Sequence, residues 1–302
     1  RNLFSDQDSP LFNRALSGQY PPASTLKPFV GMAALEAKTI SWEKEILDSG
    51  EYLVEGDERP YRGWKEGGHG KVDMNKAIIE SSDVYFYSLA YDLTVSNLSP
   101  FLEKFGFGEQ SGLTTREGTG ILPSRKWKLG YKGESWFKGD TINMGIGQGY
   151  ITATPLQIAV AYSALANKGE LVKPRIIEKI GEENTETVIK KNISLIDDLN
   201  WKRIEKSLLG VVEASNGTAN NIYDRNIRIA GKTGTAQVKS IIETEYELLR
   251  VDKSLRDHAL FVGYGPVEEP KLVVVAIIEN GESGSAVAAP LVRKAINLYS
   301  KK

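Results

Sequence analysis

The spacing of apolar residues predicts helices over much of the first two thirds of the chain. Between residues 73 and 93, apolar side chains recur near the helical period of 3.6 residues. Helices are predicted on similar grounds over residues 25–37, 98–106, 155–167 and 201–214. Turn-forming and polar residues indicate irregular structure over residues 1–23, 48–71 and 107–150, and a strand pair or meander over residues 170–190.

The last third of the chain changes to the pattern of strands. Three runs rich in apolar and β-branched residues cover residues 227–238, 259–264 and 272–279, with charged or turn-forming segments between them. An amphipathic helix is predicted over residues 290–299. Helices first and neighbouring strands later predict an α+β fold, in which helices flank an antiparallel sheet.

Composition and charge exclude some function classes. The 302 residues are 41% hydrophobic and 25% charged, which is an ordinary globular composition that can bury a sizeable core. A formal net charge of -1 provides no strong field to attract nucleic acid, so no nucleic-acid partner is expected. The longest strongly apolar run, residues 272–278, is far shorter than the ~20 residues that span a bilayer.

The residue inventory limits the chemistry further. The absence of cysteine excludes disulfides, thiolate metal sites and cysteine nucleophiles. A histidine-dependent hydrolase would have to use His69 or His258, the two histidines of the chain. No Gly-x-Ser-x-Gly turn accompanies them, because residues 281–285 lack the final glycine. We therefore expect His258 to be a structural residue at the start of a strand.

A first candidate motif is Ser24-Thr25-Leu26-Lys27, which follows two prolines and opens a predicted helix. A serine and a lysine three positions apart lie on the same helix face, so the lysine amine can take the hydroxyl proton if its pKa is lowered. Ser24 also occupies the position of a helix N-cap, which would be a purely structural role. A second copy, Ser41 to Lys44, lacks the helix-start context.

Two further motifs follow in order. Ser81-Ser82-Asp83 lies within the helix predicted over residues 73–93, where a hydroxyl and a carboxylate could relay a proton. Lys232-Thr233-Gly234-Thr235 lies in a predicted strand, where the glycine would let a ligand backbone approach and the hydroxyls could hold a carboxylate. Each pattern alone has a bland structural explanation. Together, and in this order, they form the joint signature of penicillin-binding proteins and serine β-lactamases.

With these motifs the chain resembles the transpeptidase domain of class B penicillin-binding proteins, most closely the elongation-type penicillin-binding protein 2 group of Gram-negative bacteria. Longer blocks carry the resemblance as well, namely residues 13–15, 18–28, 64–65, 68–70, 80–87, 139–141, 145–150, 152–157, 231–238 and 256–258. The resemblance implies one transpeptidase domain over residues 1–302. A mainly helical lobe would span about 30–155, an α/β lobe would combine about 1–29 with 156–302, and the active site would lie at the seam with Ser24 buried.

The resemblance also implies a role for each motif residue. Ser24 would attack the carbonyl between the two terminal D-alanines of a peptidoglycan stem peptide, with Lys27 as general base. Ser81 and Lys232 would complete the proton relay, and the N–H groups of Ser24 and Thr235 would form the oxyanion hole. Around the substrate, Thr233, Gly234 and Thr235 would bind the terminal carboxylate end. β-Lactam antibiotics would acylate the same serine, and no cofactor is expected.

The family context adds partners and location. A SEDS-class membrane glycosyltransferase and a shape-determining scaffold are the expected partners. The location expected is the periplasmic face of the bacterial inner membrane, through an N-terminal anchor that, like the pedestal domain, this chain lacks. Relatives place two sheet strands upstream of the nucleophile, but only 23 residues precede Ser24 in this sequence, so the sheet is expected to be incomplete.

Two departures from the family pattern concern charge and metal. Asp83 stands where most relatives have asparagine, and its charge would raise the pKa of Lys27. We expect Asp83 to hydrogen-bond Lys27 and the substrate amide, with Lys232 offsetting its charge. At the positions where some relatives bind zinc, this chain has Asp48, Gly63, His69 and Ser82. Only two of these are good ligands, so no zinc is expected.

Alternatives within the acyl-enzyme class stay open. A class A β-lactamase would need a Glu-x-x-Leu-Asn motif, and the nearest string, residues 196–200, has isoleucine in place of the glutamate. A D,D-carboxypeptidase would use water as acceptor. A non-enzymatic penicillin-sensing domain would share the acylation residues without an acceptor substrate.

Overall fold

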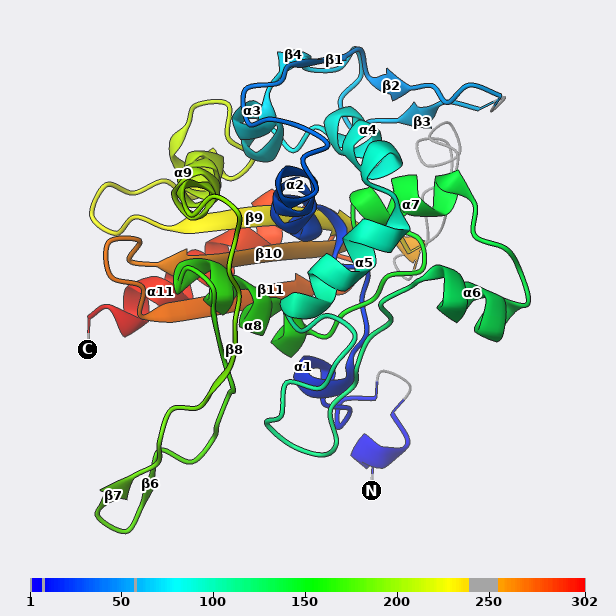
Figure 1. Cartoon of the computed structure of the whole chain (residues 1–302). Helices are drawn as coiled ribbons and strands as arrows, with labels where there is room; N and C mark the ends of the chain where they lie inside the picture. The colour runs from blue at the N-terminus through cyan, green and yellow to red at the C-terminus, as the bar shows by residue number, and fades with distance from the viewer. Residues whose placement is uncertain (1, 7–8, 57–58, 239–254, 302) are drawn as a thin grey trace.

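A three-stranded antiparallel sheet lies at the centre of the molecule (Figure 1). In this computed structural model, residues 2–6, 9–56, 59–238 and 255–301 are described. The strand order is β11-β10-β9, with β9 at Ala230–Ala236, β10 at His258–Gly265 and β11 at Leu272–Ile278. All three predicted strands and their antiparallel pairing are confirmed. The register sets Lys232 opposite Val262 and Thr235 opposite Ala259.

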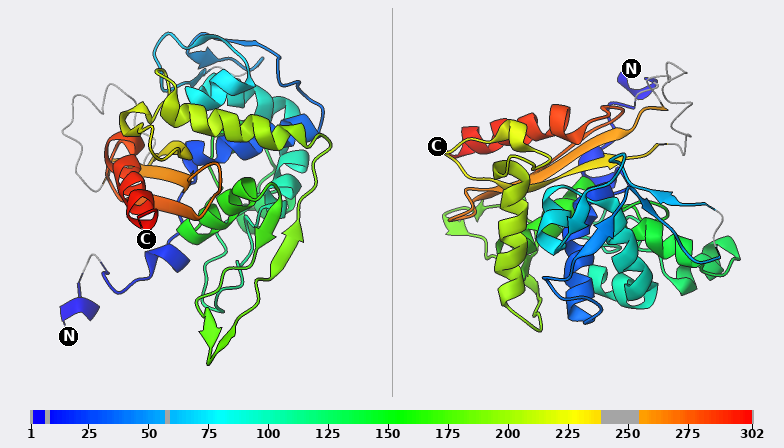
Figure 2. Two further views of the ribbon diagram at one scale, coloured as in Figure 1. Left: turned by 90° about the vertical axis from the view of Figure 1, so that its left-hand side faces the viewer. Right: turned by 90° about the horizontal axis from the view of Figure 1, so that it is seen from above.

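Helices cover both faces of this sheet. Figure 2 shows α11 (Ala289–Tyr299) on one face, and α8 (Pro155–Ala166) with the larger helical part of the molecule on the other. Helix α9 (Leu199–Glu213) packs against β9 and also against α3 (Met74–Ile79). A large hydrophobic cluster runs through these layers and includes Phe29, Tyr162 and Phe261. The predicted α+β fold is confirmed, whereas the division into two lobes stays a prediction.

The remaining elements are short helices and two-stranded hairpins. The helices are η1 (Asn2–Phe4), α1 (Arg14–Ser17), η2 (Ala23–Leu26), α2 (Lys27–Glu36), α4 (Asp83–Leu93), α5 (Val95–Lys104), α6 (Arg125–Lys132), α7 (Lys138–Gly145), η3 (Asn220–Ile222) and the π-helical turn η5 (Gly284–Ala288). The strands are β1 (Ile46–Asp48), β2 (Glu51–Tyr52), β3 (Tyr61–Arg62), β4 (Gly70–Val72), β5 (Glu170–Val172), β6 (Lys179–Ile180), β7 (Glu183–Asn184) and β8 (Ile189–Asn192).

Three predicted boundaries are wrong. The single helix predicted over residues 73–93 is two helices, α3 and α4, because the chain breaks at Ser81, whose φ is +61°. The stretch 107–150 contains α6 and α7. Both form through their caps rather than through an apolar stripe, since Ser124 caps α6 and Asp140 accepts from the Phe137 N–H at the start of α7. Residues 48–71 contain short strands.

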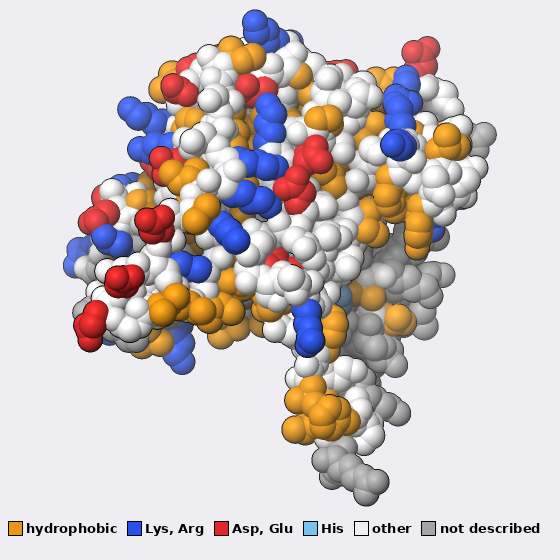
Figure 3. Space-filling model, turned by 60° about the horizontal axis from the view of Figure 1, so that its bottom comes forward, with side chains coloured by type: hydrophobic (Ala, Val, Ile, Leu, Met, Phe, Trp, Pro, Cys, Tyr) orange, Lys and Arg blue, Asp and Glu red, His pale blue; other side chains and the backbone are white. Residues whose placement is uncertain are grey.

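Charged side chains are distributed over the surface without one dominant sign. On the face shown in Figure 3, acidic and basic groups are interspersed and hydrophobic side chains occur between them. This agrees with the near balance of charge in the composition. Among the described residues, no helix has both the length and the apolar character that crossing a bilayer requires.

Candidate active site

Ser24 lies in a tight turn and not at a helix N-cap. The turn is η2, and α2 begins at Lys27, whose backbone N–H donates to the Ser24 carbonyl. The predicted capping role of Ser24 is therefore wrong. Its side chain is half-buried rather than buried, and it makes no hydrogen bond to a described residue. A serine in this state is accessible to a ligand and is not engaged in holding the helix.

The turn that carries Ser24 is held firmly by its neighbours. The Thr25 hydroxyl donates to the Pro22 carbonyl at 2.5 Å, and the buried Tyr162 hydroxyl donates to the Thr25 carbonyl at 2.8 Å. The Ala23 N–H donates to the Gly147 carbonyl at 2.9 Å. Gly147 has φ +73°, and a Cβ there would lie 2.1 Å from the Ala23 carbonyl oxygen, so only glycine fits this contact.

Lys27 lies one helical turn after Ser24 and is completely buried. Its Nζ donates to Asp83 Oδ1 at 2.6 Å, to the Ser81 carbonyl at 2.7 Å and to Ser81 Oγ at 3.2 Å. The second motif thus supplies all three hydrogen-bond acceptors of this ammonium group. The expected hydrogen bond between Asp83 and Lys27 is confirmed.

Burial and charge act on Lys27 in opposite directions. Burial lowers the pKa of Lys27, and the charge and hydrogen bond of Asp83 raise it without restoring it to the ordinary value. The expectation that Asp83 opposes the depression of the lysine pKa is correct in direction. Burial prevails, so the neutral amine is more accessible than in a solvent-exposed lysine.

The break between α3 and α4 aims the second motif at Lys27. The left-handed backbone at Ser81 is uncommon for a residue other than glycine and turns its carbonyl toward the lysine. Ser82 then caps α4 by accepting from the Tyr85 N–H at 3.1 Å. Asp83, the first residue of α4, is buried beside the lysine. The motif functions as an interhelical turn and not, as predicted, as a step on one continuous helix.

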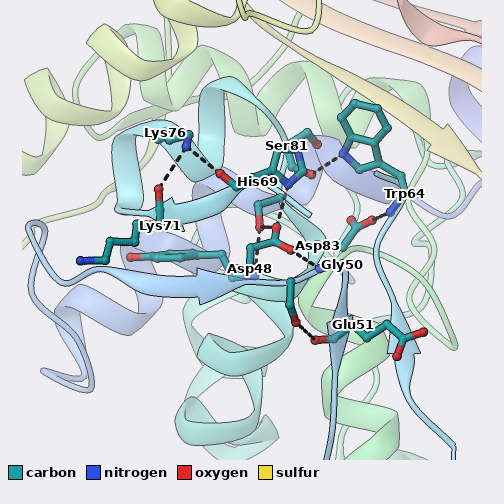
Figure 4. Close-up of polar contacts among 12 residues, drawn as sticks. Asp48, Gly50, Glu51, Trp64, His69, Lys71, Lys76, Ser81 and Asp83 are labelled. Carbon is teal, nitrogen blue, oxygen red and sulfur yellow. Dashed lines mark hydrogen bonds and ion pairs between the residues drawn. The ribbon is translucent and has the colours of Figure 1, made fainter. Parts of the chain in front are cut away.

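Trp64 braces this turn from the other side. Its backbone N–H donates to Asp83 Oδ2 at 2.9 Å, and its indole Nε1–H donates to the Ser81 carbonyl at 3.0 Å. Figure 4 shows the indole directed toward Ser81. Sequence reasoning assigned no role to Trp64, although it belongs to one of the blocks that carry the resemblance. A tryptophan in a polar, glycine-rich segment was the available signal.

The third motif forms the middle of β9. Lys232, Thr233 and Gly234 are buried, and Thr235 is exposed. A Cβ at Gly234 would lie 3.1 Å from side-chain atoms of Thr25 and Leu260. The glycine therefore lets β9 approach the turn that carries Ser24, and its closest neighbours belong to the protein itself.

Lys232 differs from Lys27 in having no hydrogen-bond partner. Its Nζ is buried and unpaired within the described part of the chain. Burial lowers the pKa of Lys232 well below its usual value, Lys27 lowers it further, and Asp83 opposes the change. The three groups thus interact electrostatically, and a neutral Lys232 amine can accept or pass a proton.

A segment that sequence reasoning missed connects the second motif with the third. Thr218 Oγ1 lies 2.8 Å from Thr233 Oγ1, and the Thr218 N–H donates to the Ile79 carbonyl at 3.3 Å. Asn216 Nδ2 donates to Glu80 Oε1 at 2.6 Å, next to the second motif. The turn after α9, residues 214–219, therefore connects α3 to β9. The only signal was a Gly-Thr pair following an amphipathic helix.

The residues aligned with the zinc positions of some relatives do meet, but as a hydrogen-bonded group. Asp48 Oδ2 accepts from Ser82 Oγ at 2.5 Å and lies 2.7 Å from His69 Nδ1. Burial raises the pKa of Asp48, but bonds from Ser82, the Gly50 N–H and His69 outweigh it and hold the pKa below its usual value. Gly63 offers no side chain. With two ligand-type residues, this group does not fit a four-coordinate zinc ion.

His258 does not serve a hydrolytic triad in this structure. It begins β10, as expected, and its Nδ1 accepts from the Asn280 N–H at 3.0 Å. Its ring packs edge-on against Tyr20 with centroids 5.6 Å apart. Burial lowers the pKa of His258. These contacts account for the histidine as part of the sheet end.

Comparison with known proteins agrees with this geometry. The family described as the penicillin binding protein transpeptidase domain matches residues 1–297. The protein named peptidoglycan D,D-transpeptidase MrdA from Haemophilus influenzae is 42% identical over 306 residues, which cover 99% of this chain and 47% of that protein. The chain thus spans about half the length of this curated relative.

Solved structures give the same result. Pseudomonas aeruginosa PBP2 in complex with WCK 5153 has a TM-score of 0.88 and 38% identity, covering 99% of this chain and 62% of that one. Helicobacter pylori PBP2 in complex with MreC has a TM-score of 0.86 and 32% identity, covering 99% and 53%. At these identities the similarity extends beyond the general fold.

Proposed function

Because the chain belongs to the family of penicillin-binding protein transpeptidase domains, we propose that it is the catalytic part of a peptidoglycan D,D-transpeptidase of the elongation type. Its substrates are stem peptides that end in D-alanyl-D-alanine, and β-lactams acylate the same serine. The observation that carries the proposal is the buried Lys27, which joins the Ser24 turn to Ser81 and Asp83.

The reaction begins at Ser24. Its Oγ bonds to the carbonyl carbon between the two D-alanines while the hydroxyl proton moves to the neutral Lys27 amine. The N–H groups of Ser24 and Thr235 stabilise the oxyanion. When the C–N bond breaks, the departing D-alanine amine takes a proton through Ser81 and Lys232. The amine of a second stem peptide then attacks the ester, which forms the crosslink and restores the Ser24 hydroxyl.

Substrate binding falls to the β9 residues. The hydroxyls of Thr233 and Thr235 hold the terminal carboxylate, and Gly234 keeps the strand close to the serine turn. Thr218 orients Thr233 through the contact between their hydroxyls. Asp83 hydrogen-bonds the substrate amide as well as Lys27. Lys232 offsets the negative charge of Asp83 when it is protonated.

The test is intact-protein mass after incubation with a penicillin, followed over hours. Wild type is expected to gain one stable adduct and Ser24→Ala none. The matched control is Ser41→Ala in the second, exposed Ser-x-x-Lys copy, which should be acylated like wild type. An adduct that persists on Ser24→Ala, or none on wild type, contradicts the assignment.

The same incubation, together with an assay on a pentapeptide donor and an added amine acceptor, separates the alternatives. A transient adduct with accumulation of hydrolysed drug would indicate a β-lactamase. Release of D-alanine from a pentapeptide without crosslinking to an added amine acceptor would indicate a D,D-carboxypeptidase. A stable adduct with neither product would indicate a penicillin-sensing domain.

Partners and location are part of the proposal. Helicobacter pylori PBP2, which is similar over nearly all of this chain, was solved in complex with MreC. By this similarity we infer that the protein works with a shape-determining scaffold and with a SEDS-class membrane glycosyltransferase in cell elongation. It would act at the periplasmic face of the bacterial inner membrane, held there by a membrane anchor.

A further inference from the structure

A groove lined in part by aromatic and basic residues lies along α6, and none of its lining residues belongs to the three motifs. Its lining consists of Ser124, Lys126, Trp127, Gly130 and Tyr131. The rings of Trp127 and Tyr131 are nearly parallel, at 17° with centroids 5.3 Å apart, and form one wall. Tyr131 is 71% exposed, so this wall faces solvent. The residue pattern of this segment predicted only irregular structure and no function.

The groove is built on a rigid base. Lys128 is buried in α6, and its Nζ forms an ion pair with Asp140 of α7 at 2.7 Å. The same ammonium group lies 4.6 Å from the ring centroid of Phe137 and 5.4 Å from that of Tyr150. Trp127 packs against Tyr150 with centroids 5.5 Å apart. Cation–π and aromatic contacts of this kind fix side chains in place.

The base is continuous with the catalytic turn. Tyr150 follows Gly147 by three residues, so their Cα atoms are at most about 11 Å apart. Gly147 accepts from the Ala23 N–H beside Ser24, and Gln148 Nε2 donates to the Thr235 carbonyl at 3.1 Å. Figure 1 shows α6 and α7 on the same side of the molecule. The groove is therefore coupled to both edges of the proposed acylation site.

We propose that this groove binds the glycan of the substrate, namely the N-acetylated hexosamine next to the stem peptide, an inference that rests on the proposed function. The C–H face of a pyranose is apolar and packs on aromatic rings, while its hydroxyl and amide groups reach solvent. Lys126 borders the groove, and Lys132 Nζ lies 5.5 Å from the Tyr131 ring centroid. These cations suit the carboxylates of a stem peptide.

The stem peptide separates the sugar from the scissile bond. The four stem-peptide residues before the scissile bond span up to about 14 Å when extended. A sugar in the groove would hold the glycan end while the D-alanyl end reaches Ser24. Binding energy from this remote part of the substrate would favour the natural substrate over a free peptide.

A membrane surface fits the groove less well. Interfacial helices gather their apolar residues on one face. In α6 the exposed Leu129 lies two positions from Trp127 and from Tyr131, on the opposite side of the helix. No single face of this helix can therefore enter a lipid layer with all three side chains.

The test compares two donors in the same protein: a disaccharide-pentapeptide, and the pentapeptide without sugar. We expect wild type to release D-alanine from the disaccharide form with a kcat/KM about tenfold higher. Tyr131→Ala should reduce that ratio to about twofold. Gly130→Gln should reduce the ratio in the same way, because the added side chain would fill the groove. The variant should still fold, since a Cβ at Gly130 meets no atom within 4 Å and glutamine favours a helix more than glycine does.

The matched control is Leu129→Gln, which changes the opposite side of the same helix and should keep the wild-type ratio. A wild-type ratio near one, or a ratio unchanged in both groove variants, overturns the glycan proposal. Loss of binding to anionic phospholipid vesicles in the groove variants, with the ratio unchanged, would identify a membrane contact and also overturns it. Penicillin acylation of Ser24 in wild type is measured in parallel, so that failure of the proposed function is recognised separately.

Discussion

Two buried lysines, Lys27 and Lys232, face the same site with opposite surroundings. Lys27 is surrounded by three oxygen acceptors from the second motif, whereas Lys232 has none among the described residues. Burial lowers the pKa of both, and only Lys27 has a directly bonded carboxylate that opposes the change. This difference in surroundings agrees with different proposed roles for the two lysines. In the proposed mechanism, Lys27 is the base, hydrogen-bonded to Asp83, and Lys232, whose pKa is lowered by burial, relays a proton.

The largest effect is expected from Lys27→Met. The variant removes the proposed base and leaves the Asp83 carboxylate buried without its cation. Penicillin acylation should slow by about 10³-fold, and the free energy of unfolding should fall by about 3–5 kcal/mol. Stopped-flow acylation and denaturant unfolding measure the two effects. Lys44→Met, in the exposed second motif copy, should change neither, and an equally stable Lys27→Met would contradict the pairing argument.

Lys232→Met is expected to reduce activity without reducing stability. Acylation is expected to slow by about 10²-fold through loss of the relay. The free energy of unfolding should stay equal or rise, because methionine removes an unpaired buried amine. A loss of stability as large as that of Lys27→Met would show that Lys232, like Lys27, stabilises the folded protein through a partner, and would contradict the comparison.

Lys232 also makes the stability of the protein depend on pH. The pKa of Lys232 is lowered in the folded state, so the unfolded chain binds this proton more tightly than the folded chain does. Between the lowered pKa and about 10.5, the folded wild type therefore gains stability relative to Lys232→Met as pH rises. Below the lowered pKa the unfavourable burial is fully present. Unfolding of both proteins at several pH values measures this difference, and a constant difference would exclude a neutral buried lysine.

Asp83→Asn tests whether the charge of Asp83 sets the pKa of Lys27. Removing the carboxylate removes the interaction that raises the pKa of Lys27, so the pKa of Lys27 should fall further. The acidic limb of the acylation rate profile should therefore move to lower pH. Unchanged acylation and turnover across the pH range would exclude a role for the charge of Asp83.

The smallest effect is expected from Thr218→Val. The variant keeps the shape of the side chain and removes the hydroxyl contact with Thr233, which is worth about 1 kcal/mol. Acylation should slow by about threefold to fivefold, mainly through weaker binding of the carboxylate end. Thr187→Val, in the exposed hairpin region, is the matched control and should behave like wild type. Unaltered substrate binding in Thr218→Val would show that Thr218 does not contribute to the site.

Sequence reasoning predicted the sheet strands and the long apolar helices well. β10, β11, α8 and α9 carry strong periodic or continuous apolar signals, and those signals come from burial itself. It failed at α6 and α7, which depend on caps and on aromatic contacts between segments. It also failed at Ser81, because apolar periodicity continues across the break and does not register a left-handed residue.

The sequence by itself determined the order and spacing of the three motifs, the α+β class and the family. These follow from residue types at short separations, which local geometry translates directly into chemistry. Only the tertiary structure decided that Ser24 is a turn residue, that Lys27 takes three acceptors from one loop, and that Trp64 and Thr218 brace the site. The physical reason is that hydrogen-bond partners distant in sequence meet only after packing, and burial then sets the pKa of each lysine.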